Sequence, residues 1–116
     1  MKIAFSLIAT IFFVNGVLAN DFLKPDQIQN LLVGKKVLGQ AVSGAMFDFQ
    51  MNSDFTATTS AAGGDTGKWR LSEEGYCATW TKIRQGTEAC FKVSKLGANY
   101  FVMGPDGSRS RIVRID

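Results

Sequence analysis

The chain contains no histidine, and only two cysteines occur among its 116 residues. Without histidine, neither a Ser-His-Asp nor a Cys-His arrangement can form within it. A zinc site would have only two thiolates and scattered carboxylates as ligands. Glu73 and Glu74 are neighbouring carboxylates, but adjacent side chains in a strand or turn point apart, which does not suit a glycosidase pair. We therefore expect a protein that is not an enzyme, with no catalytic residue, no metal and no cofactor.

A long apolar run is also missing. The stretch "IAFSLIATIFFV" (residues 3–14) is shorter than the ~20 residues that span a bilayer. Lys2 precedes it, and Val17-Leu18-Ala19 forms a small-x-small cleavage signature. This pattern predicts a secretory signal peptide over residues 1–19, cut after Ala19, and not a membrane anchor. The mature part, residues 20–116, is then expected to be one periplasmic or secreted domain without a membrane span.

No charge of one sign dominates. Thirteen basic and ten acidic residues give a net charge of +3. No basic run is dense enough to favour a nucleic-acid partner. In the last predicted strand, period-two alternation places Arg109 and Arg111 on one face and Arg114 on the other. These arginines fit either protection of a sheet edge or an anion site.

The mature part begins with one predicted helix and continues as β-structure. In "KPDQIQNLLVGK", Pro25 suits a first helical turn, Ile28, Leu31 and Leu32 share a face, and Gly34 ends the helix. Alternating apolar positions and turn residues predict eight strands, over residues 35–42, 45–51, 55–60, 66–71, 76–82, 87–94, 100–103 and 108–115.

Short connections between the predicted strands favour antiparallel neighbours and exclude βαβ crossovers. We expect an all-β up-and-down barrel with the short N-terminal helix, and a flattened β-sandwich is the alternative. Its interior is either a packed core or a ligand cavity of at least roughly 300 Å³. The aromatic side chains expected to point inward are Phe47, Phe49, Phe55, Trp69, Tyr76, Trp80, Phe91 and one of Tyr100 and Phe101.

Cys77 and Cys90 are expected to form one structural disulfide, since an exported chain meets an oxidising compartment. Strand alternation places both on the outer face of one hairpin, whose inner face carries Tyr76, Trp80 and Phe91. A four-residue loop at 83–86 would leave the cysteines diagonal and too far apart. Direct pairing needs a two-residue tip at 83–84 or a bulge near Gly86, and we favour the bulge.

The segments "LLVGK", "GKWRLSEEGYCATWTKIRQGTEACFKV" and "YFVMGPDGS" resemble a domain-of-unknown-function family of small secreted alphaproteobacterial proteins. Its G-x-W, C-x-x-W and distal-C pattern would fall on Gly67, Trp69, Cys77, Trp80 and Cys90. The chain also resembles the calycin class of lipocalin- and avidin-like barrels, although Lys36 stands where a lipocalin has tryptophan. The resemblance implies a calycin-like barrel and no particular activity.

"VSGAMF" (residues 42–47) resembles the Ser-Gly segment that small periplasmic lysozyme inhibitors insert into their target. Two functions are therefore expected as alternatives, both for a monomer. The first is binding of a small apolar or amphipathic ligand inside the barrel, by Trp69, Tyr76, Trp80 and Phe91. The second is an inhibitor or immunity role through an envelope protein that would contact Ser43, Arg84 and Arg109.

Overall fold

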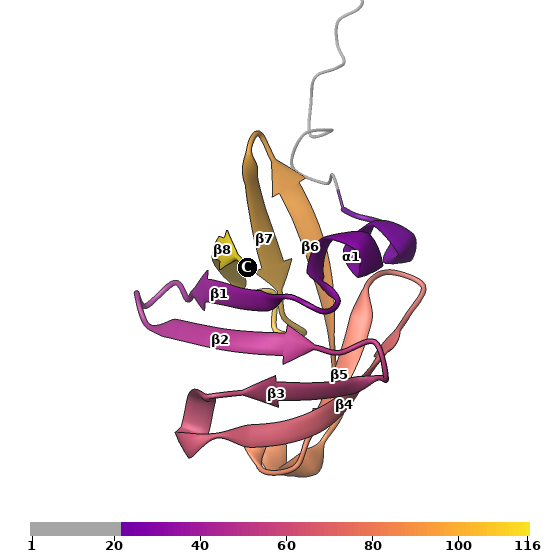
Figure 1. Ribbon diagram of the computed structural model, residues 1–116. Helices are drawn as coiled ribbons and strands as arrows, with labels where there is room; N and C mark the ends of the chain where they lie inside the picture. Colours follow the sequence, from indigo (N-terminus) through magenta and orange to yellow (C-terminus); the bar gives the residue numbers. More distant parts are fainter. Residues whose placement is uncertain (1–21) are drawn as a thin grey trace, which may run out of the picture.

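The computed structural model describes residues 22–116, so the predicted signal peptide lies outside the described residues. One helix is followed by eight strands (Figure 1). Their bounds are α1 Pro25–Leu32, β1 Lys36–Gln40, β2 Met46–Met51, β3 Thr56–Thr59, β4 Asp65–Leu71, β5 Tyr76–Trp80, β6 Ala89–Leu96, β7 Asn99–Met103 and β8 Arg109–Ile115. Every strand expected from the sequence is present, with ends shifted by a few residues.

The strands form a closed antiparallel barrel in which each pairs with its neighbours in the sequence, and β8 pairs with β1. The predicted barrel is thus confirmed, and the alternative of a flattened sandwich is wrong. Closure removes the unpaired edges that a sheet of eight short strands would otherwise expose. Because consecutive strands run in opposite directions, the loops alternate between the two ends of the barrel.

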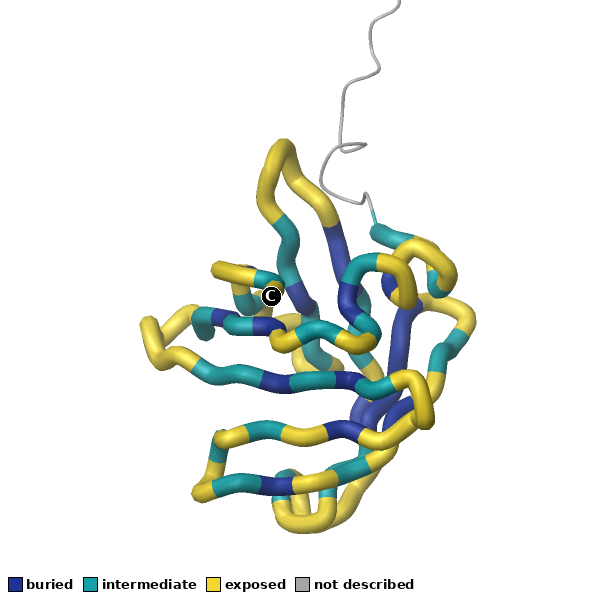
Figure 2. The backbone as a smooth tube through the Cα atoms, in the orientation of Figure 1, coloured by how far each residue is buried: buried dark blue, intermediate teal, exposed yellow. Residues whose placement is uncertain are grey.

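Helix α1 covers one end of the barrel. Pro25 fixes the first turn, and the Gln27 side chain accepts a hydrogen bond from the backbone N–H of Lys24. Ile28 and Leu32, one turn apart, are completely buried against the core. Gly34 then adopts a positive φ of 82° and turns the chain into β1. The helix therefore closes one end of the barrel, and Figure 2 shows the buried segments gathered beside it.

The opposite end, which we call the mouth, is bounded by the loops 41–45, 60–64, 81–88 and 104–108. Two seams between strands stop short of the mouth. Strands β2 and β3 pair only at Gln50↔Thr58 and Met51↔Ala57. Strands β5 and β6 pair only at the three positions from Tyr76↔Phe91 to Ala78↔Ala89. The barrel is therefore tightly laddered near α1 and splayed at the mouth.

A bulge in β8 corrects one prediction from strand alternation. Gly39 pairs with Ile112, but the preceding residue, Leu38, pairs with Arg114. Val113 of β8 therefore has no partner in β1. The extra residue, Val113, is 41% exposed, and it brings Ile115 opposite Val37, which is buried in the core. Arg114 consequently shares the outer face with Arg109 and Arg111, because a bulge reverses the alternation beyond it.

The aromatic side chains follow the expected inner face with one exception. Phe55 lies in the β2–β3 turn with a φ of 69°, is 57% exposed, and packs its ring 5.2 Å from that of Trp69. It was expected inside because the strand was predicted one residue too early. Of Tyr100 and Phe101, Tyr100 has the inward parity, and it packs against the core beside Leu31 of α1.

Candidate functional site

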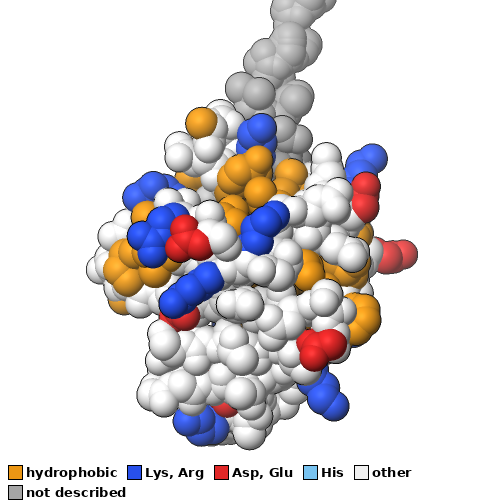
Figure 3. Space-filling view, viewed as in Figure 1, with side chains coloured by type: hydrophobic (Ala, Val, Ile, Leu, Met, Phe, Trp, Pro, Cys, Tyr) orange, Lys and Arg blue, Asp and Glu red, His pale blue; other side chains and the backbone are white. Residues whose placement is uncertain are grey.

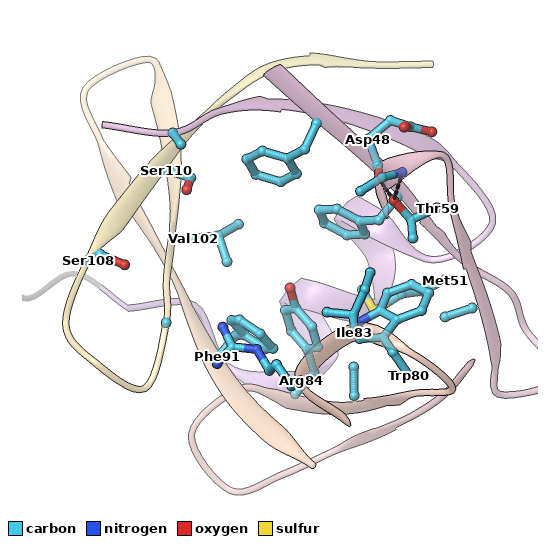
Figure 4. Close-up of a pocket in the computed structure, with 18 residues that line it drawn as sticks. Asp48, Met51, Thr59, Trp80, Ile83, Arg84, Phe91, Val102, Ser108 and Ser110 are labelled. Carbon is cyan, nitrogen blue, oxygen red and sulfur yellow. Dashed lines mark hydrogen bonds between the residues drawn. The ribbon is translucent and has the colours of Figure 1, made fainter. Parts of the chain in front are cut away.

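A cavity of about 350 Å³ occupies the mouth half of the barrel (Figure 4). It exceeds the volume that would separate a ligand cavity from a packed core. The wall is mainly apolar, and its larger apolar members are Phe47, Phe49, Met51, Trp80, Ile83, Phe91 and Val102. Thr59, Ser108 and Ser110 add hydroxyl groups. Half of the barrel is thus a packed core under α1, and half is open.

Three of the four predicted ligand-binding residues line this cavity. Tyr76 and Phe91 are paired across β5 and β6, and their rings stack with centroids 5.2 Å apart. Trp80 lines the wall further towards the mouth and is partly exposed. Trp69 does not line it. The Trp69 ring is 4% exposed in the core, and its indole N–H donates a 2.8 Å hydrogen bond to the carbonyl of Asn52.

The Tyr76 hydroxyl is one of the polar groups of the cavity wall. The residue is 5% exposed, and none of the hydrogen bonds among residues 22–116 involves its hydroxyl. Burial raises the pKa of Tyr76, so the hydroxyl stays protonated at neutral pH. No side-chain oxygen of the described residues is both fully buried and unpaired, so the Tyr76 hydroxyl is accessible from the cavity. The cavity therefore offers one hydrogen bond to whatever fills it.

Asp65, at the start of β4, holds the β5–β6 loop over the cavity. One carboxylate oxygen accepts hydrogen bonds from the backbone N–H groups of Lys82 and Ile83, both at 2.9 Å, and the other accepts one from Thr66. Burial alone would raise the pKa of Asp65, but these three donors and the charge of Lys82 together lower it. Asp65 is therefore ionised at neutral pH and fixes the position of this loop.

Arg84 follows directly in the same loop and lines the mouth of the cavity. Its φ of 57° begins a run of three left-handed residues that continues through Gln85 and Gly86. The guanidinium carbon lies 5.7 Å from the centre of the Phe91 ring, a cation–π contact that Figure 4 shows. Arg84 makes no ion pair with any residue in the described part of the chain.

The other two predicted partner-binding residues also lie at the mouth. Ser43 is exposed in the β1–β2 loop, next to Val42, which is 82% exposed. Arg109 begins β8 directly after the β7–β8 loop and is exposed on the outer wall. Figure 3 shows hydrophobic side chains over the end of the β1–β2 hairpin, with lysine or arginine beside them. Residues predicted from separate motifs thus gather around one opening.

Cys77 and Cys90 form the predicted disulfide. They are direct register partners, with Cα atoms 3.9 Å apart. The favoured bulge near Gly86 is wrong, because the β5–β6 ladder ends at Ala78↔Ala89 and residues 81–88 form a wide loop in which Gly86 has positive φ. The direct pairing of the two cysteines corresponds to the register of the other alternative, which centres the hairpin on residues 83–84. Cys77 and Cys90 lie on the outer wall, and Cys77 is nevertheless only 1% exposed.

An ion pair lies beside the disulfide on the outer wall. Arg70 is the register partner of Cys77, and its side chain donates two hydrogen bonds to the carboxylate of Glu88. In the described residues, Cys77, Glu88 and Cys90 form the single close group of side chains of metal-ligand type. Both sulfur atoms are joined to each other and do not act as thiolates. This group is therefore structural.

Sequence reasoning missed Asp65, Ile83 and the role of Gly39. Asp65 lies between two predicted strands, and a buried aspartate gives no periodic signal. Gly39 faces inward opposite Phe47, and a Cβ atom on it would lie 2.4 Å from the tip of the Phe47 ring. The signal available for Gly39 was a glycine inside an otherwise apolar strand, which often marks close approach of another group.

Fold and cavity together define a small closed antiparallel barrel with a partly open interior. Comparison with protein-family models, with curated proteins and with solved structures found no match to this chain. Among residues 22–116, no helix has both the length and the apolar character needed to cross a bilayer. What the site does must therefore be argued from its own geometry.

Proposed function

We propose that this chain is an exported, non-catalytic binding protein that holds a small amphipathic ligand in its barrel. The observation that carries the proposal is the 350 Å³ cavity, walled by aromatic and aliphatic side chains and open towards solvent. Binding sites of this kind are concave, mostly apolar and equipped with a few polar groups. Here the polar groups include the Tyr76 hydroxyl and, at the mouth, the guanidinium of Arg84.

The size of the cavity limits the ligand. If each water-sized group needs ~30 Å³, the cavity accepts about a dozen non-hydrogen atoms. A ligand of that size would replace water along the apolar wall, at a gain of ~25 cal/mol for each Å² of apolar surface that is buried. Export belongs to the same proposal, and the Cys77–Cys90 disulfide supports it because structural disulfides persist in oxidising compartments.

Titration with decan-1-ol, an uncharged amphiphile that fits this size, tests the proposal by calorimetry. The variant Ala78→Leu extends a buried wall residue into the cavity. The variant Val113→Leu enlarges an exposed side chain on the outer wall and serves as the matched control. We expect Ala78→Leu to weaken binding by about tenfold or more and Val113→Leu to leave it unchanged. Equal affinities in the two variants would place the ligand outside the barrel.

A second candidate function is binding of an envelope protein by the mouth loops, as an inhibitor or immunity protein would. It is favoured by the exposed apolar side chains of Val42 and Met46, which are 82% and 50% exposed on either side of Ser43. Large exposed apolar groups at a loop end often belong to interaction surfaces. Affinity capture with the wild type and with a Val42→Ser/Met46→Ser variant tests this candidate. A partner retained equally by both would contradict it.

A further inference from the structure

We propose that the ligand of this cavity is a monoanionic amphiphile of the carboxylate class, whose acidic group binds Arg84 at the mouth while its apolar body fills the barrel. This inference rests on the proposed function and specifies the ligand. It starts from the position of Arg84, which is the cationic side chain among the residues that line the cavity.

The N–H donors of the Arg84 guanidinium are available to bind an anion. Its carbon stands 5.7 Å from the centre of the Phe91 ring, and this cation–π contact favours the charged group at the cavity wall. The planar guanidinium carries N–H donors that can bind a carboxylate in a bidentate manner. No ion pair or side-chain hydrogen bond to residues 22–116 occupies these donors.

The acidic side chains Asp48 and Asp106, near the mouth, already accept hydrogen bonds from serine residues. Asp48, which also lines the cavity, accepts hydrogen bonds from the backbone N–H and hydroxyl of Ser60. Asp106 accepts two from Ser108, and these bonds, with the charge of Arg84 as a smaller contribution, lower its pKa. Asp106 nonetheless stays beyond ion-pair distance of Arg84. A ligand carboxylate would therefore meet Arg84 without displacing an existing ion pair.

The loop geometry keeps Arg84 at this position. Asp65 fixes the two preceding residues, Lys82 and Ile83, through their backbone N–H groups. Left-handed conformations at Arg84 and Gln85 are unusual for residues other than glycine and persist where the surroundings determine them. Such a loop holds the backbone of Arg84 beside the cavity, so that its guanidinium can reach the mouth.

The free-energy cost of removing water from the carboxylate determines the orientation of the ligand. Arg84 is exposed, so a carboxylate bound to it remains partly hydrated. A carboxylate inside the cavity would meet a mainly apolar wall that carries hydroxyl groups but, among the described residues, no cationic side chain other than Arg84. Burying an unpaired charge costs far more than burying an alkyl chain gains. The acidic group therefore stays at the mouth, and the apolar end enters first.

Three probes of equal chain length separate the head group from the apolar body: decanoate, decan-1-ol and decylammonium. Each is titrated by calorimetry below the concentration at which it aggregates, at low and at moderate salt, into the wild type and two variants. Arg84→Gln removes the charge at the mouth. Arg109→Gln removes an equally exposed charge from the outer wall near the same end and is the matched control. Thermal unfolding and far-UV circular dichroism establish that both variants are folded.

We expect the wild type to bind decanoate about tenfold or more tightly than the other two probes, because a bidentate charge-assisted contact is worth roughly that factor. Arg84→Gln should lose this preference while its affinity for decan-1-ol stays within about twofold, and Arg109→Gln should keep it. Added salt should weaken the binding of decanoate alone. If decanoate and decan-1-ol bind equally well to the wild type, or if decylammonium binds best, the anionic ligand is refuted and the cavity-binding function stands. If none of the three binds, the proposed function itself fails.

Discussion

The carboxylate of Asp65 accepts a hydrogen bond from the backbone N–H of Ile83 at 2.9 Å, across 18 residues of sequence. This contact joins the start of β4 to the loop that follows β5, on the side of the barrel where β5 and β6 no longer pair. Ile83 and its neighbour Arg84 both line the cavity. One buried carboxylate thus anchors the β5–β6 loop to β4 where the β5–β6 ladder is absent.

Replacing Asp65 with asparagine should loosen the β5–β6 loop without unfolding the barrel. Asparagine keeps the size of the side chain but loses the charge that strengthens its bonds to backbone N–H groups. Lys82 and Arg84 are trypsin sites within this loop, so we expect Asp65→Asn to be cleaved there several-fold faster than the wild type. Asp54→Asn is the matched control, because Asp54 accepts hydrogen bonds from Thr56 in the β2–β3 turn at the other end of the barrel. Equal cleavage in the two variants would contradict this role of Asp65.

The same group predicts an acid-sensitive mouth. The pKa of Asp65 is lower in the folded chain than its ordinary value of 3.8, so the unfolded chain binds the proton first as the pH falls. The stability that Asp65 contributes is therefore present above about pH 4 and is lost as the pH falls through its folded pKa. The Asp65 carboxyl shift followed by NMR should show a midpoint below 3.8. A midpoint at or above 3.8 would mean that the backbone donors do not stabilise the ionised form.

Strand alternation carried most of the fold prediction, and it failed where local geometry breaks the period. Eight strands, their order and the inward set Phe47, Phe49, Tyr76 and Phe91 follow from alternation in the sequence. The bulge at Val113 reversed the face of Arg114, and no residue in "RSRIVRI" marks it. The sequence does not predict the left-handed φ of Phe55 either, because aromatic residues rarely adopt it.

The candidate site was predictable only in part. Tyr76, Trp80 and Phe91 were assigned to an inner face from parity alone, and the cavity lies against that face. Trp69 has the same parity but packs beside the β2–β3 turn, where it contacts Phe55 and Asn52, and position along the barrel axis is not encoded in a period-two pattern. The contact of Asp65 with the β5–β6 loop depends on a gap between strands that only the three-dimensional register reveals.

Removing the disulfide should lower stability and widen the β5–β6 seam. Cys77 and Cys90 join the two strands next to the point where their pairing ends. The link is separated by 13 positions in sequence, and closing so short a loop contributes about 3 kcal/mol to the free energy of unfolding. Urea denaturation of Cys77→Ala/Cys90→Ala should show a loss of that order, and the oxidised wild type should gain two hydrogens in mass on reduction. Unchanged stability would show that the three β-ladder pairs suffice.

The two tryptophans should report differently on ligand binding. Trp80 lines the cavity, whereas Trp69 is buried in the core and bonded to the carbonyl of Asn52. A ligand that replaces water beside Trp80 should shift its emission to shorter wavelength. We expect Trp69→Phe to keep this response to decan-1-ol and Trp80→Phe to lose it. An emission shift that persists in Trp80→Phe would indicate that Trp69 senses the bound ligand.

Substitution of two glycines by alanine tests the packing of the barrel wall. The added methyl group should cost much more stability at Gly75 than at Gly39. At Gly39, a Cβ atom would lie 2.4 Å from the tip of the Phe47 ring, which can rotate away. At Gly75, it would lie 1.9 Å from the backbone carbonyl oxygen of Phe91, which cannot move without shifting the β5–β6 ladder. Gly75→Ala should therefore lower the free energy of unfolding by about 3 kcal/mol, at the upper end of overpacking costs, or prevent folding.

Gly39→Ala should cost less than about 1.5 kcal/mol in stability, yet it should still affect binding, because the displaced Phe47 ring belongs to the cavity wall. A ring turned into the cavity occupies space that the ligand needs. Urea denaturation and calorimetric titration with decan-1-ol measure the two effects separately. We expect a nearly normal midpoint with binding weakened by about tenfold. A Gly39→Ala variant that binds normally would mean that the Phe47 ring moves outward and that the cavity keeps its volume.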